Sequence, residues 1–294
     1  MSSTLRRNRS VSFGAVTLGF VDYTRPRLGR SERDIGETLA RARIYLTGRV
    51  SLEGDAALVD ERHLAGRQGR LAFVRLAIDR HQPLSRDRLV SAIWPDAPPR
   101  EVDIAVGAIL SKLRTAIKKT GLSEREAGID VRLGSITLRL PMQVWIDLEE
   151  AANAIDEAEG MWRVGDHVRA WGGASVAVSI GRRPFLANEE APWIEAQRAN
   201  LRLLLTRGLQ CLSAVSAMNG ESSLAVQYAS EVVELEPFRE TAYQQLMRLH
   251  AQMGNRAEAL RVFGRCRELL REELGASPSP ETEALFLQIL RDTG

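Results

Sequence analysis

Basic and polar side chains recur along one face of the segment Glu101–Thr120, and their types suit contacts with a polyanion. Lys and Arg neutralise phosphates, a Ser hydroxyl can reach the edge of a base, and an Arg can pair with guanine through two hydrogen bonds. Gly107 adds only a close approach of the backbone. A solvated helix face without a ligand is the alternative interpretation. The candidate residues on this face are Asp103, Gly107, Ser111, Lys112, Arg114, Thr115, Lys118 and Lys119.

Two further arginines, Arg132 and Arg139, lie in the alternating segments Ile129–Arg132 and Ile136–Leu140. Alternation on either side of Gly134-Ser135 predicts a β-hairpin. From a hairpin beside the helix, both arginines would reach a phosphate backbone or a minor groove. If they face the edge of the core instead, they are structural, and the sequence leaves the two outcomes open.

Catalytic and metal-binding patterns are missing from the sequence. Its four histidines are scattered without ligand spacing, and its two cysteines lie in helical patterns that favour buried, reduced thiols. Acidic pairs such as Glu189-Glu190 are interpreted as surface or helix-terminal charge, and no G-x-x-x-x-G-K-[ST] motif is present. We therefore expect no catalytic residues, no bound metal and no cofactor.

Charge is divided unevenly along the chain. Residues 1–141 carry a balance of +9 and residues 142–294 a balance of −7, which together give the net charge of +2. A basic half joined to an acidic half indicates that one half engages a polyanion and the other does not. Two unrelated surface compositions would give the same numbers.

Short strands, three helices and a hairpin are predicted, in that order, before residue 142. The strands are Ile44–Leu52 and Ala57–Val59, separated by a turn at Glu53-Gly54-Asp55. The helices are Gly69–Arg80, Arg86–Trp94 with Ser85 as its N-cap, and Glu101–Thr120. This is the element order of a winged helix-turn-helix, in which the last helix enters a major groove about 12 Å wide.

The helix Glu101–Thr120 also has a clear apolar stripe opposite its polar face. Its apolar residues recur at intervals of three and four, so one side is predicted to be buried. They are Val102, Val106, Ile109, Leu110, Leu113 and Ile117.

Everything after Asp147 is predicted to be helical, and these helices repeat. Gly220 and Gly254 are 34 residues apart, and Ala225 and Ala259 keep the same interval. Paired helices with a period of 34 are typical of tetratricopeptide repeats, which present a concave surface to a protein partner. An ordinary helical bundle with accidental spacing is the alternative. The predicted helices are 148–159, 165–180, 193–218, 222–234, 238–253, 256–273 and 281–291.

Several strings in this region resemble the bacterial transcriptional activator domain. They are Trp193–Arg198 (WIEAQR), Glu236–Glu240 (EPFRE), Leu246-Met247, Gly254–Leu260 (GNRAEAL) and, most specifically, Glu272–Thr282 (EELGASPSPET). Upstream, Pro83-Leu-Ser, Leu89–Trp94, Pro98–Arg100 and Ser111–Arg114 are similar to the OmpR/PhoB-type winged helix. This pair of domains resembles the Streptomyces antibiotic regulatory protein (SARP) family. The resemblance implies an activator that binds direct repeats near a promoter, as a homodimer, and contacts RNA polymerase.

The sequence therefore predicts a mainly α protein with a winged helix followed by an all-α, tetratricopeptide-like region. Residues 1–42 are predicted to be a basic, flexible extension, residues 43–141 a DNA-binding winged helix, and residues 147–294 the activator domain. We expect a cytoplasmic protein without a membrane span, whose partners are double-stranded DNA and RNA polymerase. The alternative is a protein-interaction adaptor whose winged helix no longer binds DNA.

Overall fold

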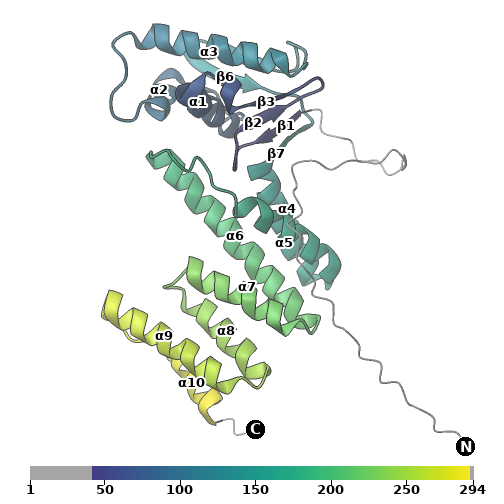
Figure 1. Cartoon of the computed structure of the whole chain (residues 1–294), viewed down its shortest axis with the longest axis vertical. Helices are drawn as coiled ribbons and strands as arrows, with labels where there is room; N and C mark the ends of the chain where they lie inside the picture. The colour runs from purple at the N-terminus through teal and green to yellow at the C-terminus, as the bar shows by residue number, and fades with distance from the viewer. Residues whose placement is uncertain (1–41, 292–294) are drawn as a thin grey trace, which may run out of the picture. The chain divides into compact units, whose positions relative to one another are not determined.

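The structure is a computed structural model that describes residues 42–291 of the chain (Figure 1). Residues 1–41 and 292–294 lie outside the described residues. The predicted basic extension therefore falls outside them, except for Ala42, which is the first residue of a strand.

A four-stranded sheet opens the described chain, in the order β3-β2-β1-β7. Its strands are β1 (Ala42–Tyr45), β2 (Ser51–Glu53), β3 (Leu58–Asp60) and β7 (Val144–Ile146). Neighbouring strands are antiparallel, except that β7 returns from far along the chain to pair parallel with β1.

The prediction of one strand from Ile44 to Leu52 is wrong, because the chain turns back between them. Gly48, with a φ of 70°, lies in the turn, and β1 pairs with β2 so that Ile44 faces Leu52. Both side chains are fully buried. The apolar pattern is therefore satisfied by two short strands of one hairpin. Strand β7 was not predicted, because three residues directly before a helix give no alternation to detect.

Three helices follow: α1 (Gly66–Ile78), α2 (Arg86–Ile93) and α3 (Val102–Lys119), with a short 3₁₀ helix, η1 (Glu61–His63), before α1. The Oγ of Ser85 accepts a hydrogen bond from the Arg88 N–H at 3.3 Å, which confirms the predicted N-cap. Gly69 is required by packing, since a Cβ there would lie 1.8 Å from the Leu64 carbonyl oxygen.

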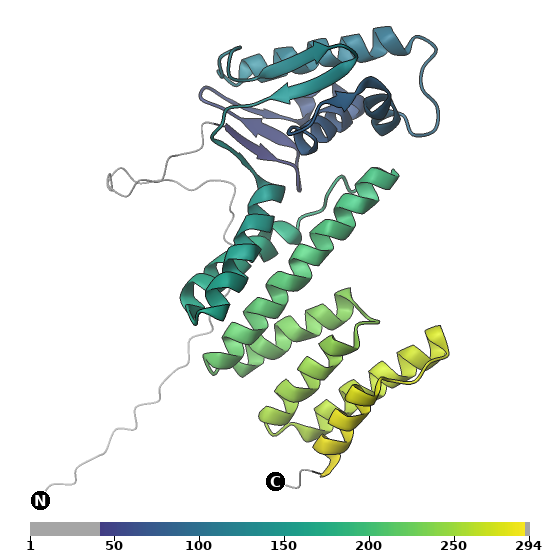
Figure 2. The same cartoon turned by 180° about the vertical axis from the view of Figure 1, so that it is seen from behind.

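A second sheet supports α3, in the order β4-β6-β5. Its strands are β4 (Leu84–Ser85), β5 (Gly128–Arg132) and β6 (Ser135–Arg139). The predicted hairpin is confirmed, but its turn is at Leu133-Gly134, one residue earlier than expected, and both residues have a positive φ. The strands, three helices and hairpin form the winged helix, and Figure 2 shows the hairpin beside α3.

The rest of the described chain is helical, as predicted. None of its helices, nor any other helix within residues 42–291, is long and apolar enough to cross a membrane. The helices are α4 (Asp147–Arg163), α5 (His167–Gly181), α6 (Pro192–Met218), α7 (Ser222–Leu235), α8 (Glu240–Gln252), α9 (Arg256–Leu274) and α10 (Pro280–Arg291).

Three helix pairs, α4–α5, α6–α7 and α8–α9, close with the same turn. Gly165, Gly220 and Gly254 lie in the left-handed region, with φ of 81°, 78° and 74°. The residue after each glycine donates its N–H to a carbonyl five residues back, in the pairs Asp166–Met161 (2.9 Å), Glu221–Ser216 (2.8 Å) and Asn255–His250 (2.8 Å). Five residues after each glycine stands a fully buried alanine: Ala170, Ala225 and Ala259. The repeat therefore has one more unit than the 34-residue interval indicated.

The EELGASPSPET string docks α10 onto α8. The carboxylate of Glu240 accepts hydrogen bonds from the N–H and Oγ of Ser279, at 2.8 and 2.9 Å, and from the Oγ1 of Thr282 at 2.5 Å. Gln244 adds a bond to the same threonine hydroxyl, at 2.9 Å. Two of the strings that carry the family resemblance therefore contact each other in the fold.

The first helix of the helical region is tied to the first sheet through Asp147. This carboxylate is fully buried and accepts hydrogen bonds from the N–H groups of Leu46, Thr47 and Leu148 and from the Thr47 hydroxyl. Because α4 begins at the residue after β7, these bonds fix where the helix leaves the sheet.

The loop before α6 and the first turns of α6 also pack against the winged helix. Phe185, Leu186, Ile194 and Leu201 belong to the same buried cluster as the winged-helix core, whereas a second cluster holds the repeat together. Trp193 donates from Nε1 to the Ala92 carbonyl at 3.3 Å, at the end of α2. The predicted boundaries at residues 141 and 147 stay predictions.

Candidate nucleic-acid interface

Helix α3 is anchored by the apolar stripe that the sequence indicated. Val106, Ile109, Leu110, Leu113 and Ile117 are all buried in the core of the winged helix. Anchoring one side of an α-helix leaves the other side facing solvent along its full length. The eight candidate residues of α3 are accordingly all exposed.

The line of α3 that faces outward most directly passes through Ile104, Ser111 and Lys118. These residues are seven apart, which is close to two turns, so their side chains stack along one direction. Gly107, Ala108 and Thr115 lie beside this line and are also exposed. Ile104, with 67% of its surface exposed, was not among the candidates, although its spacing from Ser111 was a usable signal.

The charged residues of α3 differ in whether they have a partner. Asp103 forms an ion pair with Arg86 at 2.5 Å, and Lys118 forms one with Glu124 at 2.9 Å. The hydrogen bond from Lys118 holds the pKa of Glu124 below its usual value. Lys112 and Lys119 form no ion pair with any residue in the described range.

Two of the predicted arginines hold the wing in place, one from α3 and one from within the wing. Arg114 donates from Nε to the Ile129 carbonyl of β5 at 3.0 Å. Arg139 forms an ion pair with Asp130 at 3.0 Å and donates to the carbonyls of Glu124 and Arg125. The hydrogen bond from Arg139 lowers the pKa of Asp130. These bonds hold Arg139 against the protein and favour the structural role, one of the two outcomes that the sequence left open.

Arg132, unlike Arg139, faces solvent. It is exposed at the end of β5, next to the turn at Leu133-Gly134, and its side chain forms no ion pair within residues 42–291. Arg86 completes this corner: its N–H donates to the Gly134 carbonyl at 3.1 Å, while its guanidinium contacts Asp103. Arg86 therefore links the turn of the wing to the start of α3, and it was not among the candidates.

A cleft of about 340 Å³ separates the C-terminal half of α3 from the wing. Arg114, Lys118 and Arg139 line it together with Glu124. Each of these three basic side chains bonds to another residue of the protein, and much of the remaining lining is apolar, including Leu122 and Ile129.

The thiols are buried, as the sequence indicated. Burial, with a smaller effect from a nearby glutamate, raises the pKa of both Cys211 and Cys266 to about 11. Neutral thiols of this kind are poor nucleophiles at neutral pH. Among residues 42–291 there is also no group of three or more His, Cys, Asp or Glu side chains that could hold a metal ion.

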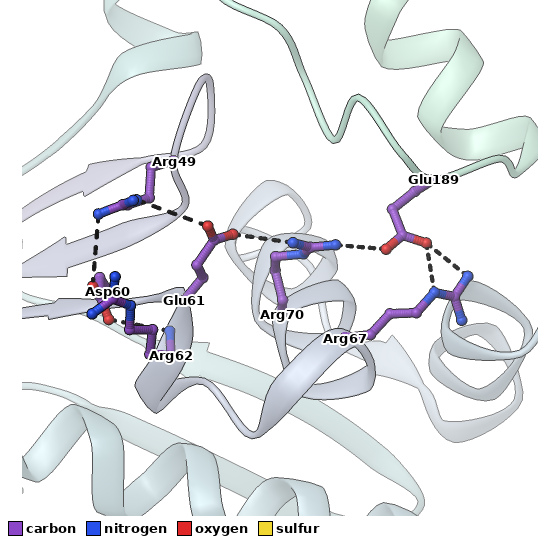
Figure 3. Close-up of polar contacts among 7 residues, drawn as sticks. All are labelled: Arg49, Asp60, Glu61, Arg62, Arg67, Arg70 and Glu189. Carbon is purple, nitrogen blue, oxygen red and sulfur yellow. Dashed lines mark hydrogen bonds and ion pairs between the residues drawn. The ribbon is translucent and has the colours of Figure 1, made fainter.

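One acidic residue does not behave as the sequence indicated. Glu189, interpreted as surface or helix-terminal charge, lies in the loop before α6, is only 3% exposed and contacts two arginines of α1 (Figure 3). Its carboxylate lies 2.7 Å from Arg67 and 2.6 Å from Arg70. Arg70 also contacts Glu61 at 3.0 Å, so the ion pairs form a chain across the winged helix.

Comparisons with known proteins agree with this architecture. The bacterial transcriptional activator domain matches residues 146–290. Regulatory protein AfsR of Streptomyces griseus is 27% identical over 229 residues, which are 76% of this chain and 22% of AfsR. Transcriptional regulatory protein MoaR1 of Mycobacterium tuberculosis is 24% identical over 226 residues, which are 76% of this chain and 71% of MoaR1.

A solved structure shares the fold. Mycobacterium tuberculosis EmbR, in complex with a low-affinity phosphopeptide, matches with a TM-score of 0.75 and 21% identity, over 85% of this chain and 65% of EmbR. This chain thus spans only about a fifth of the length of AfsR but most of MoaR1. The chain therefore carries a bacterial transcriptional activator domain at residues 146–290, preceded by a winged helix, and it is similar to SARP-like regulators.

Proposed function

We propose that the protein regulates transcription by binding double-stranded DNA, with α3 in the major groove and the β5–β6 wing beside it. The supporting observation is the exposed face of α3, on which Lys112 and Lys119 form no ion pair within the described residues. A lysine without a protein partner is available to neutralise a phosphate, which is the main source of affinity for DNA.

The ten predicted site residues take three roles in this proposal. Lys112, Lys118, Lys119 and Arg132 contact phosphates, and binding of DNA replaces Glu124 as the partner of Lys118. Ser111 and Thr115 reach base edges, and Gly107 lets the backbone approach the groove. Arg114, Arg139 and Asp103 hold the wing and α2 in place around α3.

The helical region supplies the second half of the function. A stack of helix pairs offers a surface to a protein or peptide, and the SARP resemblance points to RNA polymerase as the partner. We propose that the protein activates transcription by recruiting the polymerase, as a homodimer on direct repeats, in the cytoplasm. The names of its relatives are those of transcription regulators, and we expect no enzymatic activity.

The salt dependence of DNA binding tests this proposal. Fluorescence anisotropy with labelled duplex DNA gives the slope of the logarithm of the association constant against the logarithm of the salt concentration. This slope is negative, and its magnitude decreases by about 0.9 for each phosphate contact removed. The double variant Lys112→Ala/Lys119→Ala is expected to decrease that magnitude by about two. Arg202→Ala is the matched control, because Arg202 is exposed on α6 and forms no ion pair within residues 42–291. Its slope is expected to equal that of the wild type.

Two results would contradict the proposal. An unchanged slope in the double variant would show that these lysines of α3 do not contact the DNA. If the wild type binds no DNA even at low salt but still retains RNA polymerase, the protein is an adaptor with a winged helix that no longer binds DNA.

A further inference from the structure

The N-terminal half of α3 presents apolar and small side chains to solvent. Ile104 is 67% exposed, Ala108 is exposed one turn later, and Gly107 lies between them. Ile104 extends its branched side chain away from the core that holds Val106 and Ile109. These three residues carry no side-chain hydrogen-bond donor or acceptor, so they cannot pair with guanine or adenine.

Charge is segregated along the same helix. Lys112, Lys118 and Lys119 lie in the C-terminal half, whereas the charges near the N-terminal half are Asp103 with its partner Arg86, and Arg100 and Glu101 directly before the helix. The lysines proposed to contact phosphates thus lie at one end of the helix, and the apolar surface of Ile104, Gly107 and Ala108 lies at the other. Ser111 lies between the two halves, on the same outward line as Ile104 and Lys118.

Gly107 adds no side chain to this surface. A Cβ built there would meet no atom within 4 Å, so packing within the described residues does not require glycine. Glycine inside a helix is destabilising by about 1 kcal/mol relative to alanine. Without a Cβ at this position, the edge of a base pair can approach the helix between Ile104 and Ala108.

We propose, on the basis of the DNA-binding function above, that Ile104 and Ala108 recognise the 5-methyl groups of thymine in the major groove. Thymine is the base that presents a methyl group there, and apolar side chains can contact that methyl group. The preferred sites then contain A·T pairs opposite the N-terminal half of α3, flanked by phosphates that the lysines contact.

Deoxyuridine tests this directly, because it differs from thymidine only in lacking the methyl group. Duplexes that the full chain prefers are first selected from a random pool, and each thymine is then replaced singly by deoxyuridine. Loss of one buried methyl is expected to weaken binding about fourfold at the positions that α3 contacts. The variant Ile104→Ala is expected to fold, because the residue is exposed. In this variant the ratio of the affinities for the thymine duplex and the uracil duplex is expected to fall to about one at one position.

Lys119→Ala is the control variant. It is expected to weaken binding to thymine and uracil duplexes equally, because a phosphate contact does not depend on the methyl group. The ratio of the two affinities should therefore stay the same. Selective DNA binding with a ratio of one at every thymine would overturn this proposal and leave the proposed function standing. A ratio that persists in Ile104→Ala would also overturn it, and failure to select any duplex would overturn both.

Discussion

The carboxylate of Glu189 contacts the guanidinium of Arg70 at 2.6 Å, across 119 residues of sequence (Figure 3). Glu189 lies in the loop before α6, and Arg70 lies on α1 of the winged helix. Because Glu189 is only 3% exposed, water contributes little to stabilising its charge, and the arginines must do so. The attachment of the helical region to the winged helix therefore depends on charge as well as on apolar contact.

Replacing Glu189 by glutamine is expected to lower the free energy of unfolding by about 2 kcal/mol. The amide can accept a hydrogen bond from one arginine, but its NH₂ group faces the other. The loss is smaller than the roughly 3–5 kcal/mol for a fully buried pair, because Arg67 is 54% exposed. Urea denaturation measures it, with Glu190→Gln as the exposed neighbouring control. Equal stability of the two variants would show that the ion pairs are not needed.

The sequence could not identify this contact, because adjacent acidic residues in a loop look the same whether they face solvent or a partner. What buries Glu189 is the fold of its surroundings: Arg198 donates to the carbonyls of Phe185, Leu186 and Glu189 and so shapes the loop. Periodicity predicted α3 well, because this helix has a long apolar stripe, but long-range pairing of charges leaves no periodic signal.

Asp147→Asn is expected to destabilise the protein by about 1–3 kcal/mol. The buried carboxylate accepts from three backbone N–H groups and a hydroxyl, at 2.7 to 3.0 Å. An asparagine keeps one acceptor oxygen and turns an NH₂ group towards other donors, which leaves buried donors unpaired. Thermal or urea unfolding measures the change. Asp96→Asn, at an exposed position, is the control, and a loss as small as that of the control would contradict the prediction.

The pH dependence of stability is expected to contain a contribution from Glu240. Burial raises the pKa of this carboxyl, but hydrogen bonds from Thr282 and Ser279 outweigh it and hold the pKa below the ordinary value of 4.5. A group with a lowered pKa in the folded state stabilises the protein above its unfolded-state pKa and loses that contribution as the pH falls. The destabilisation caused by Glu240→Gln should therefore be largest above pH 4.5 and shrink below it.

Urea denaturation of the wild type and Glu240→Gln at several pH values between 3 and 7 measures this difference. Glu234→Gln, at an exposed position of α7, should show no such trend. A difference for Glu240→Gln that grows as the pH falls would have the wrong sign.

The repeat and the candidate interface were each predicted in part, for related reasons. The interval of 34 residues detects the turns at Gly220 and Gly254, but the turn at Gly165 lies 55 residues before Gly220 because a loop and the longer α6 intervene. On α3, periodicity identified the buried stripe correctly. Ile104 lies outside that stripe, and it was missed because the candidate contacts were sought mainly among basic and polar side chains.

Gly107→Ala is expected to raise the free energy of unfolding by about 0.5–1 kcal/mol, because alanine is the better helix former and its Cβ meets no atom within 4 Å. Gly264→Ala in α9 is the matched control, since a Cβ there also meets nothing within 4 Å, and it should stabilise the protein by a similar amount. The two variants should differ in DNA binding. Only Gly107→Ala adds a methyl group to the face of α3, so only this variant should bind the selected duplexes more weakly. Equal DNA affinity of both variants would show that the surface between Ile104 and Ala108 does not approach the groove closely.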